Sequence, residues 1–179
     1  MTDTQTVPPL TGYLRGPVTG FGLAVAAVVG LLDQASKLWL LFVYELGSRG
    51  PVRVTPFFDL VLTWNTGISY GLLQQDGPFG QWALLVLKVV AVALLWIWLA
   101  RTPSRLTALA LGLIMGGAVG NAIDRMAYGA VADFALFYIR TPTWNFNWYV
   151  FNLADVAIVA GVPVLLYESL IGERAAKAP

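Results

Sequence analysis

The stretch LTALALGLIMGGAVGNAIDRMA, Leu106–Ala127, decides the fold, because it is apolar over the length of a membrane crossing. A helix needs roughly 20 apolar residues to cross a bilayer. Gly112, Gly116 and Gly120 recur in it at every fourth residue. Small residues at that spacing let the backbone of a neighbouring helix approach closely. We therefore predict a membrane-spanning helix that packs tightly against other helices.

Acidic residues occur within or beside several such apolar stretches. A carboxylate at the centre of a spanning helix costs about 2.5–3.5 kcal/mol on insertion-based scales. Several such groups gathered on one side of the membrane indicate a functional site in a membrane protein. They are Asp33, Asp124, Asp133 and Asp155, with Asp59 nearby.

The composition supports the same class of protein. Of the 179 residues, 58% are hydrophobic and 12% are charged, and the mean hydropathy is +0.69. These values are typical of a small polytopic membrane protein. A net charge of +1 gives no reason to expect nucleic-acid binding. The absence of Cys and His excludes thiol nucleophiles, histidine metal sites and histidine-based catalytic triads.

The expected fold is a membrane all-α protein with a small β element, forming one domain over residues 1–179. Four transmembrane helices are predicted at residues 18–44, 79–100, 106–127 and 151–171, with flexible tails at 1–17 and 173–179. Four spans place both termini on one side. Five Lys and Arg residues against four weakly favour a cytoplasmic side for them. The acidic residues then belong to the opposite side.

Two segments on that opposite side are too long for tight turns. Residues 45–78 contain the β-branched and aromatic run Phe57–Trp64, which predicts strands ending at the turn Asn65–Gly67 and a small sheet on the membrane surface. Leu72–Gly80 could add a short helix or loop. Residues 128–150 are rich in aromatic side chains, and we expect a surface loop or helix there. It could be an interfacial aromatic belt or a lid over the acidic site.

Some of the polar residues have a plausible structural role. Asp33 and Lys37 lie one helical turn apart, so they could form an ion pair or tie their helix to residues 106–127. Asn121 and Asp124 share a helix face beside Arg125, which could stabilise the helix end or position a substrate.

Asp133 and Asp155 each stand in apolar surroundings, where a functional role is favoured. Two carboxylates close together in a low-dielectric site cannot both ionise, so they share a proton and can act as base and acid together. Such a pair suits the attack of water on a peptide carbonyl. Spacing alone does not single out this pair among the acids.

Five motifs occur in order along the chain: DQASK at 33–37, NTGISYG at 65–71, GGAVGNAIDR at 116–125, VADF at 131–134 and FNLAD at 151–155. Together they resemble lipoprotein signal peptidase, or signal peptidase II. Residues Thr141–Asn147 look longer and more aromatic than is usual in that family, and Val156 stands where serine is common.

The resemblance implies a bacterial inner-membrane aspartic peptidase with cytoplasmic termini and a small periplasmic β-cradle near its active site. It implies removal of the signal peptide from prolipoproteins, just before a diacylglyceryl-modified cysteine. Prolipoproteins and membrane lipids are the expected partners of a monomer, with no metal or organic cofactor. The catalytic pair carries over onto Asp133 and Asp155. The substrate-binding or supporting positions are Asn65, Gly67, Asn121, Asp124, Arg125, Asn152, Asp33 and Lys37.

Other functions remain open. A Ser-Lys peptidase could use Ser36 or Ser69 with Lys37 or Lys88, although adjacent Ser36 and Lys37 point to different faces of a helix. A presenilin-type protease is disfavoured because the sequence contains no Gly-x-Gly-Asp. A proton-coupled transporter or scaffold could use the acids as a relay, but four spans without repeats argue against a transporter.

Overall fold

The computed structural model describes residues 14–67 and 78–176. Long helices and short strands make up this part of the chain. In chain order they are α2 (Thr19–Leu38), the π-helix η1 (Trp39–Val43), α3 (Leu46–Arg49), β1 (Val52–Thr55), β2 (Phe58–Asn65), α4 (Pro78–Arg101), α5 (Arg105–Tyr128), β3 (Val131–Arg140), β4 (Asn145–Asn147) and α6 (Leu153–Ala176).

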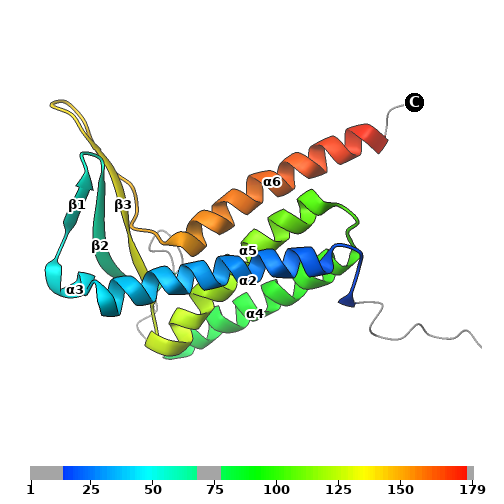
Figure 1. The fold of residues 1–179 in the computed structure, drawn as a ribbon, viewed down its shortest axis with the longest axis horizontal. Helices are drawn as coiled ribbons and strands as arrows, with labels where there is room; N and C mark the ends of the chain where they lie inside the picture. The colour runs from blue at the N-terminus through cyan, green and yellow to red at the C-terminus, as the bar shows by residue number, and fades with distance from the viewer. Residues whose placement is uncertain (1–13, 68–77, 177–179) are drawn as a thin grey trace, which may run out of the picture.

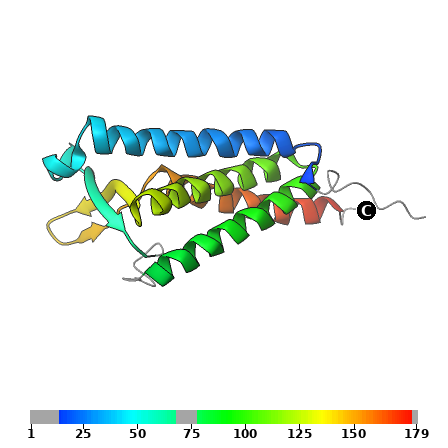
Figure 2. The ribbon, with the colours of Figure 1, turned by 90° about the horizontal axis from the view of Figure 1, so that it is seen from below.

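The long helices run alongside one another, and the sheet stands across one end of them (Figure 1). Helix α5 is central, because it packs against α2, α4 and α6 (Figure 2). Helix α2 begins and α6 ends at the end of the bundle away from the sheet. This arrangement brings the ends of α2 and α5 and the start of α6 together beside the sheet.

The glycines of α5 explain how closely its neighbours approach. A Cβ on Gly116 would lie 2.6 Å from the backbone oxygen of Ala26 in α2. A Cβ on Gly117 would lie 2.4 Å from the backbone oxygen of Ala154 in α6. Real side chains do not fit at such distances, so the glycines admit two helices on two sides of α5. The predicted close packing is confirmed.

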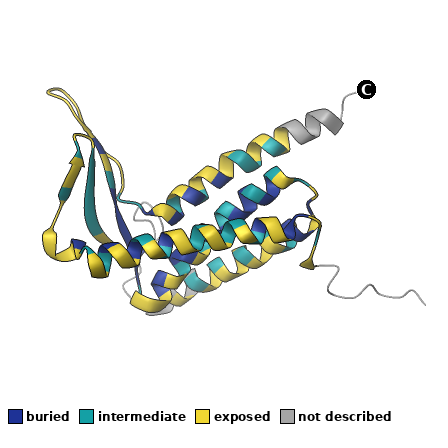
Figure 3. Cartoon of the chain, viewed as in Figure 1, coloured by how far each residue is buried: buried dark blue, intermediate teal, exposed yellow. Residues whose placement is uncertain are grey.

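Three helices within the described residues are long and apolar enough to cross a membrane: Thr19–Val43, Arg105–Tyr128 and Leu153–Leu170. Large apolar side chains on α2, α4 and α6 are exposed, as a lipid-facing surface requires (Figure 3). Helix α4 forms at the position of the predicted second span. A total of four spans stays a prediction.

The small sheet has the strand order β1-β2-β3-β4, with antiparallel pairs throughout. Leu60 of β2 pairs with Ala135 of β3, and both pack with Leu40 in η1 and Leu46 in α3. The predicted strands before the turn at Asn65 are confirmed. The sheet is thus fixed to the helices by an apolar cluster on one face.

Two expectations are wrong. Residues 128–150 do not form a surface loop or helix; they contain β3 and β4, because residues 131–137 pair with residues 58–65 far back in the chain. The predicted tail from residue 173 is wrong as far as Ala176, where α6 ends. The helix or loop expected at Leu72–Gly80 lies largely outside the described residues, and α4 already begins at Pro78.

We predict that Gly116→Ala destabilises the protein by about 1–3 kcal/mol, because the added methyl group must push α2 away from α5. Gly20→Ala in α2 is the matched control, since its Cβ would meet nothing within 4 Å. That control should be neutral or slightly stabilising. Unfolding in detergent by heat or denaturant measures both, and equal stability of the two variants would contradict the packing argument.

Candidate active site

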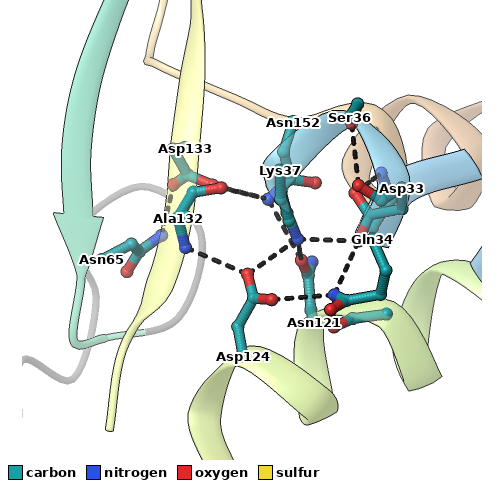
Figure 4. Close-up of polar contacts among 12 residues, drawn as sticks. Asp33, Gln34, Ser36, Lys37, Asn65, Asn121, Asp124, Ala132, Asp133 and Asn152 are labelled. Atoms are coloured by element: carbon teal, nitrogen blue, oxygen red, sulfur yellow. Dashed lines mark hydrogen bonds and ion pairs between the residues drawn. The ribbon is translucent and has the colours of Figure 1, made fainter. Parts of the chain in front are cut away.

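A buried lysine lies at the centre of the polar cluster (Figure 4). The Lys37 Nζ atom is 2.8 Å from Asp33 Oδ2 and 2.8 Å from Asp124 Oδ2. All three side chains are at most 2% exposed. The pair predicted within α2 and the tie to α5 therefore both exist. They are the salt bridges found in the part of the chain that the structure describes.

The same two carboxylates also accept hydrogen bonds from backbone groups of other elements. Asp33 Oδ1 accepts from the amide of Ala154 at 2.9 Å, in the first turn of α6. Asp124 Oδ2 accepts from the amide of Ala132 at 3.1 Å, in β3. The ion cluster therefore joins α2 and α5 to the two segments that carry Asp133 and Asp155.

Gln34 completes this cluster, and the sequence reasoning missed it. Its Nε2 donates to Asp124 Oδ1 at 2.8 Å and to the backbone oxygen of Gly120 at 3.0 Å. The signal was present, because Gln34 lies three residues before Lys37 and so on nearly the same side of α2.

Asn121 connects the buried lysine to the candidate dyad. Its Oδ1 accepts from Lys37 Nζ at 3.0 Å and from Asn152 Nδ2 at 3.0 Å. Because two donors fix this oxygen, the amide nitrogen must point the other way, and it donates to Asp155 Oδ1 at 2.9 Å. The lysine thereby sets which end of the amide faces Asp155.

The start of α6 holds Asp155 through a reciprocal cap. The amide of Asp155 donates to Asn152 Oδ1 at 2.9 Å, and the amide of Asn152 donates to Asp155 Oδ2 at 3.2 Å. Asn followed by Asp three residues later fits this capping geometry.

Asp133 lies on β3 and is only 2% exposed. Its Oδ1 accepts from Asn152 Nδ2 at 2.6 Å and its Oδ2 from Asn65 Nδ2 at 3.1 Å. Burial, followed by the charge of Asp155, raises the pKa of Asp133 to about 6, although the two amide donors and Lys37 oppose the shift. Asn152 thus contacts both aspartates.

Arg125 fixes the loop that follows β2. Its guanidinium donates to the backbone oxygens of Thr66 and Gly67. The amide of Gly67 in turn donates to Asn65 Oδ1 at 3.0 Å. This turn leaves the amide nitrogen of Asn65 directed at Asp133.

A cavity of about 750 Å³ brings both aspartates to one surface. Its walls come from the end of β2 and the following loop, from Asp133, from residues 148–151 and from the outer side of α6. The lining residues are Thr63, Trp64, Asn65, Thr66, Gly67, Asp133, Trp148, Tyr149, Val150, Phe151, Asp155, Val156, Ile158, Val159 and Ala160.

All ten residues chosen from the sequence thus meet in one connected network beside this cavity. Asp59 does not join them, because it lies on β2 and accepts a hydrogen bond from the Tyr138 hydroxyl at 2.9 Å. Ser36 donates to the backbone oxygen of Asp33 at 2.7 Å, while Lys37 is engaged by two carboxylates, so these neighbours do not form a Ser-Lys dyad. Ser69 lies outside the described residues.

The fold is similar to that of solved bacterial membrane enzymes. One, determined by the in meso method at 2.3 Å resolution, superposes with a TM-score of 0.74 at 22% identity, covering 93% of this chain and 96% of that one. A second, at 1.9 Å resolution, gives a TM-score of 0.69 over 88% of this chain and 97% of that one. The chain therefore shares the fold of these helical membrane proteins.

The sequence comparisons identify the family. The family model for signal peptidase II matches residues 25–171. The lipoprotein signal peptidase of Nitrobacter hamburgensis is 63% identical over 161 residues, which are 90% of this chain and 97% of the relative. That of Rhodopseudomonas palustris strain TIE-1 is 59% identical over 158 residues, 88% of this chain and 96% of the relative. The chain belongs to the signal peptidase II family, which is a family of peptidases.

We predict that Lys37→Met destabilises the protein by about 3–5 kcal/mol, because two buried carboxylates lose their shared cation. Lys88→Met is the matched control: Lys88 lies on α4 and is only partly buried, so its replacement should cost much less. Adding Asp33→Asn and Asp124→Asn to Lys37→Met should restore part of the loss. Denaturant unfolding in detergent measures this series, and an unchanged Lys37→Met stability would contradict the assigned role.

Proposed function

We propose that this protein is an aspartic endopeptidase in which Asp133 and Asp155 activate water. One observation carries the proposal: both carboxylates line the same cavity, and Asn152 donates to each of them. Neither aspartate has a hydrogen bond from a Lys or Arg side chain among the contacts described. In such a site two nearby carboxylates lower their energy by sharing one proton.

The shared proton gives the pair both catalytic roles. The ionised carboxylate takes a proton from water as the water oxygen attacks the peptide carbonyl carbon. The protonated carboxyl gives its proton to the carbonyl oxygen, forming a neutral tetrahedral diol. The carboxyl formed in the first step then protonates the leaving amine, while the other carboxylate recovers a proton from the diol as the carbon–nitrogen bond breaks. The cycle needs neither a metal nor an organic cofactor.

The substrate that we propose is a diacylglyceryl-modified prolipoprotein, cut just before its lipidated cysteine. Support comes from the relatives, which are lipoprotein signal peptidases. The cavity adds to this support, because it extends from the aspartates along α6 past Val156 and Val159, which are exposed apolar residues. A lipidated substrate could enter sideways from the bilayer along that face.

The proposed location is the bacterial inner membrane, crossed four times by a monomer with cytoplasmic termini. The sheet and the aspartates then lie at the periplasmic surface. The placement of the sheet at the end of the bundle away from the start of α2 and the end of α6 is consistent with this orientation (Figure 1). The residues that would position the dyad or the substrate are Asn65, Gly67, Asn121, Asp124, Arg125, Asp33 and Lys37.

The edge of β2 is the proposed docking site for the extended peptide around the scissile bond. β1 pairs with β2 only from Phe58 to Leu60 in the described register. Thr63 to Asn65 continue β2 beyond that pairing and line the cavity. Addition of a strand at a sheet edge would align the peptide carbonyls beside Asp133.

We predict that a photo-crosslinker placed at the residue before the substrate cysteine attaches to Thr63–Asn65. Because β-strand addition brings the peptide backbone next to this edge, crosslinks to α4 or to β1 should be minor. Mass spectrometry of an Asp155→Asn complex, which holds uncleaved substrate, locates the adducts. Adducts confined to helices would rule out the strand-pairing proposal.

Cleavage of a synthetic prolipoprotein tests the proposed chemistry. Purified protein should cut the diacylglyceryl-modified form and leave the unmodified form intact. Asp133→Asn and Asp155→Asn should each lose at least about a thousandfold in kcat/KM, because an amide can neither accept nor deliver the proton. Asp59→Asn is the matched control, since an amide oxygen can still accept the Tyr138 hydroxyl.

Three results would overturn the proposal. Full activity in a folded Asp133→Asn or Asp155→Asn variant would show that the substituted aspartate is not catalytic. Loss of activity in Ser69→Ala with the dyad variants unaffected would favour the Ser-Lys alternative. Ion or solute flux in proteoliposomes without any cleavage would favour the relay alternative.

A further inference from the structure

The hairpin formed by β3 and β4 extends past the helices to one side of the molecule (Figure 1). Its outer half, residues 139–147, is mostly exposed (Figure 3). The proposed chemistry at Asp133 and Asp155 does not use this part of the chain. Its two faces differ sharply in character.

One face of the hairpin is a continuous row of aromatic rings. The rings of Trp144 and Phe146 are stacked, with centroids 5.5 Å apart and planes 15° from parallel. The ring of Phe146 is 5.8 Å from that of Trp148. Ile139 of β3 pairs with Phe146 in the strand register, so its side chain belongs to the same face. We call Trp144, Phe146, Trp148 and Ile139 the aromatic face.

The opposite face is polar. Asn145 and Asn147 alternate with the aromatic residues along β4 and are exposed. On β3, the Tyr138 hydroxyl donates to Asp59 at 2.9 Å, and the Arg140 guanidinium lies 4.7 Å above the Tyr138 ring. This alternation places one apolar and one polar face on a single hairpin.

The aromatic face points towards the side of the sheet on which the helices lie. Trp148 lines the cavity together with Asp155 and Val156 of α6. Leu60 and Ala135, which pair across β2 and β3, pack with Leu40 of η1 and Leu46 of α3. Helices that are long and apolar enough to cross a bilayer lie on this side, and the hairpin tip projects beyond them (Figure 1). A bilayer crossed by these helices would place lipid below the tip.

We propose that the aromatic face docks onto the phospholipid interface of the leaflet nearest the sheet and holds the sheet at a fixed depth. The face is continuous with exposed apolar side chains of α6, Val156 and Val159, through the cavity wall. Indole rings favour this depth, because their apolar body sits among lipids while the N–H reaches headgroups or water. The proposal depends only on the helices that are long enough to cross a membrane, so it is independent of the peptidase chemistry.

Single spin labels test the docking directly, since the chain contains no native cysteine. Phe146→Cys and Asn147→Cys place neighbouring labels on the two faces of β4. Each is reconstituted, without substrate, in nanodiscs of phosphatidylethanolamine and phosphatidylglycerol. Collision with oxygen, which partitions into lipid, is compared with collision with a water-soluble nickel chelate. Ile139→Cys and Arg140→Cys repeat the comparison on β3 if a β4 variant does not fold.

The expected result is an oxygen-to-nickel ratio several-fold higher at 146 than at 147, and higher at 139 than at 140. Equal ratios on the two faces would show that the hairpin stands in water and would overturn the proposal. Spin–spin broadening between labels at 146 would also overturn it, because a second copy of the chain would then cover the face. Neither readout depends on cleavage, so failure of the peptidase assay leaves this test intact.

Discussion

The shared ammonium of Lys37 is the interaction on which the rest of the site depends. Two carboxylates buried at a membrane surface cost several kcal/mol unless a cation compensates them. Lys37 compensates both Asp33 and Asp124, and those carboxylates then accept backbone hydrogen bonds from Ala154 and Ala132. The first turn of α6 and the start of β3 are thereby anchored to the same point. Because those segments carry Asp133 and Asp155, a charge in α2 helps to set the positions of these two aspartates.

The two pairs of aspartates differ in the groups that contact their carboxylates. Asp33 and Asp124 share the single cation of Lys37 as an ion-pair partner, which suits a structural role. Asp133 and Asp155 receive hydrogen bonds from asparagine amides and backbone groups instead. These donors orient the carboxylates without neutralising them, so burial and mutual repulsion still favour a shared proton. The asparagines therefore position the proposed dyad, and no cation within the described residues pairs with it that would prevent the proposed proton exchange.

Much of the fold and of the ion cluster was predictable, because these features depend on local sequence. The apolar runs predicted the helices, and the spacing of the glycines in α5 predicted the close packing. The spacing of Asp33 and Lys37 predicted their ion pair. Asp133 and Asp155 were chosen through motif resemblance, since spacing alone could not separate them from Asp59. Strand β3, Val131–Arg140, was not predicted because its pairing partner is β2, and a pairing between segments far apart in the chain leaves no local signal. The backbone donors at Ala132 and Ala154 carry no side-chain signature at all.

The central claim is that Asp133, buried beside Asp155, has a pKa raised to about 6 and so takes up a proton at a higher pH than an ordinary aspartate. Infrared difference spectroscopy tests it directly, because a protonated carboxyl has a carbonyl stretch that a carboxylate lacks. As the pH falls through about 6, the account predicts the appearance of one such band, absent in Asp133→Asn. In Asp155→Asn the midpoint should move to lower pH, since the neighbouring negative charge is gone. A band near that pH that survives Asp133→Asn, or no band at all, would contradict the account.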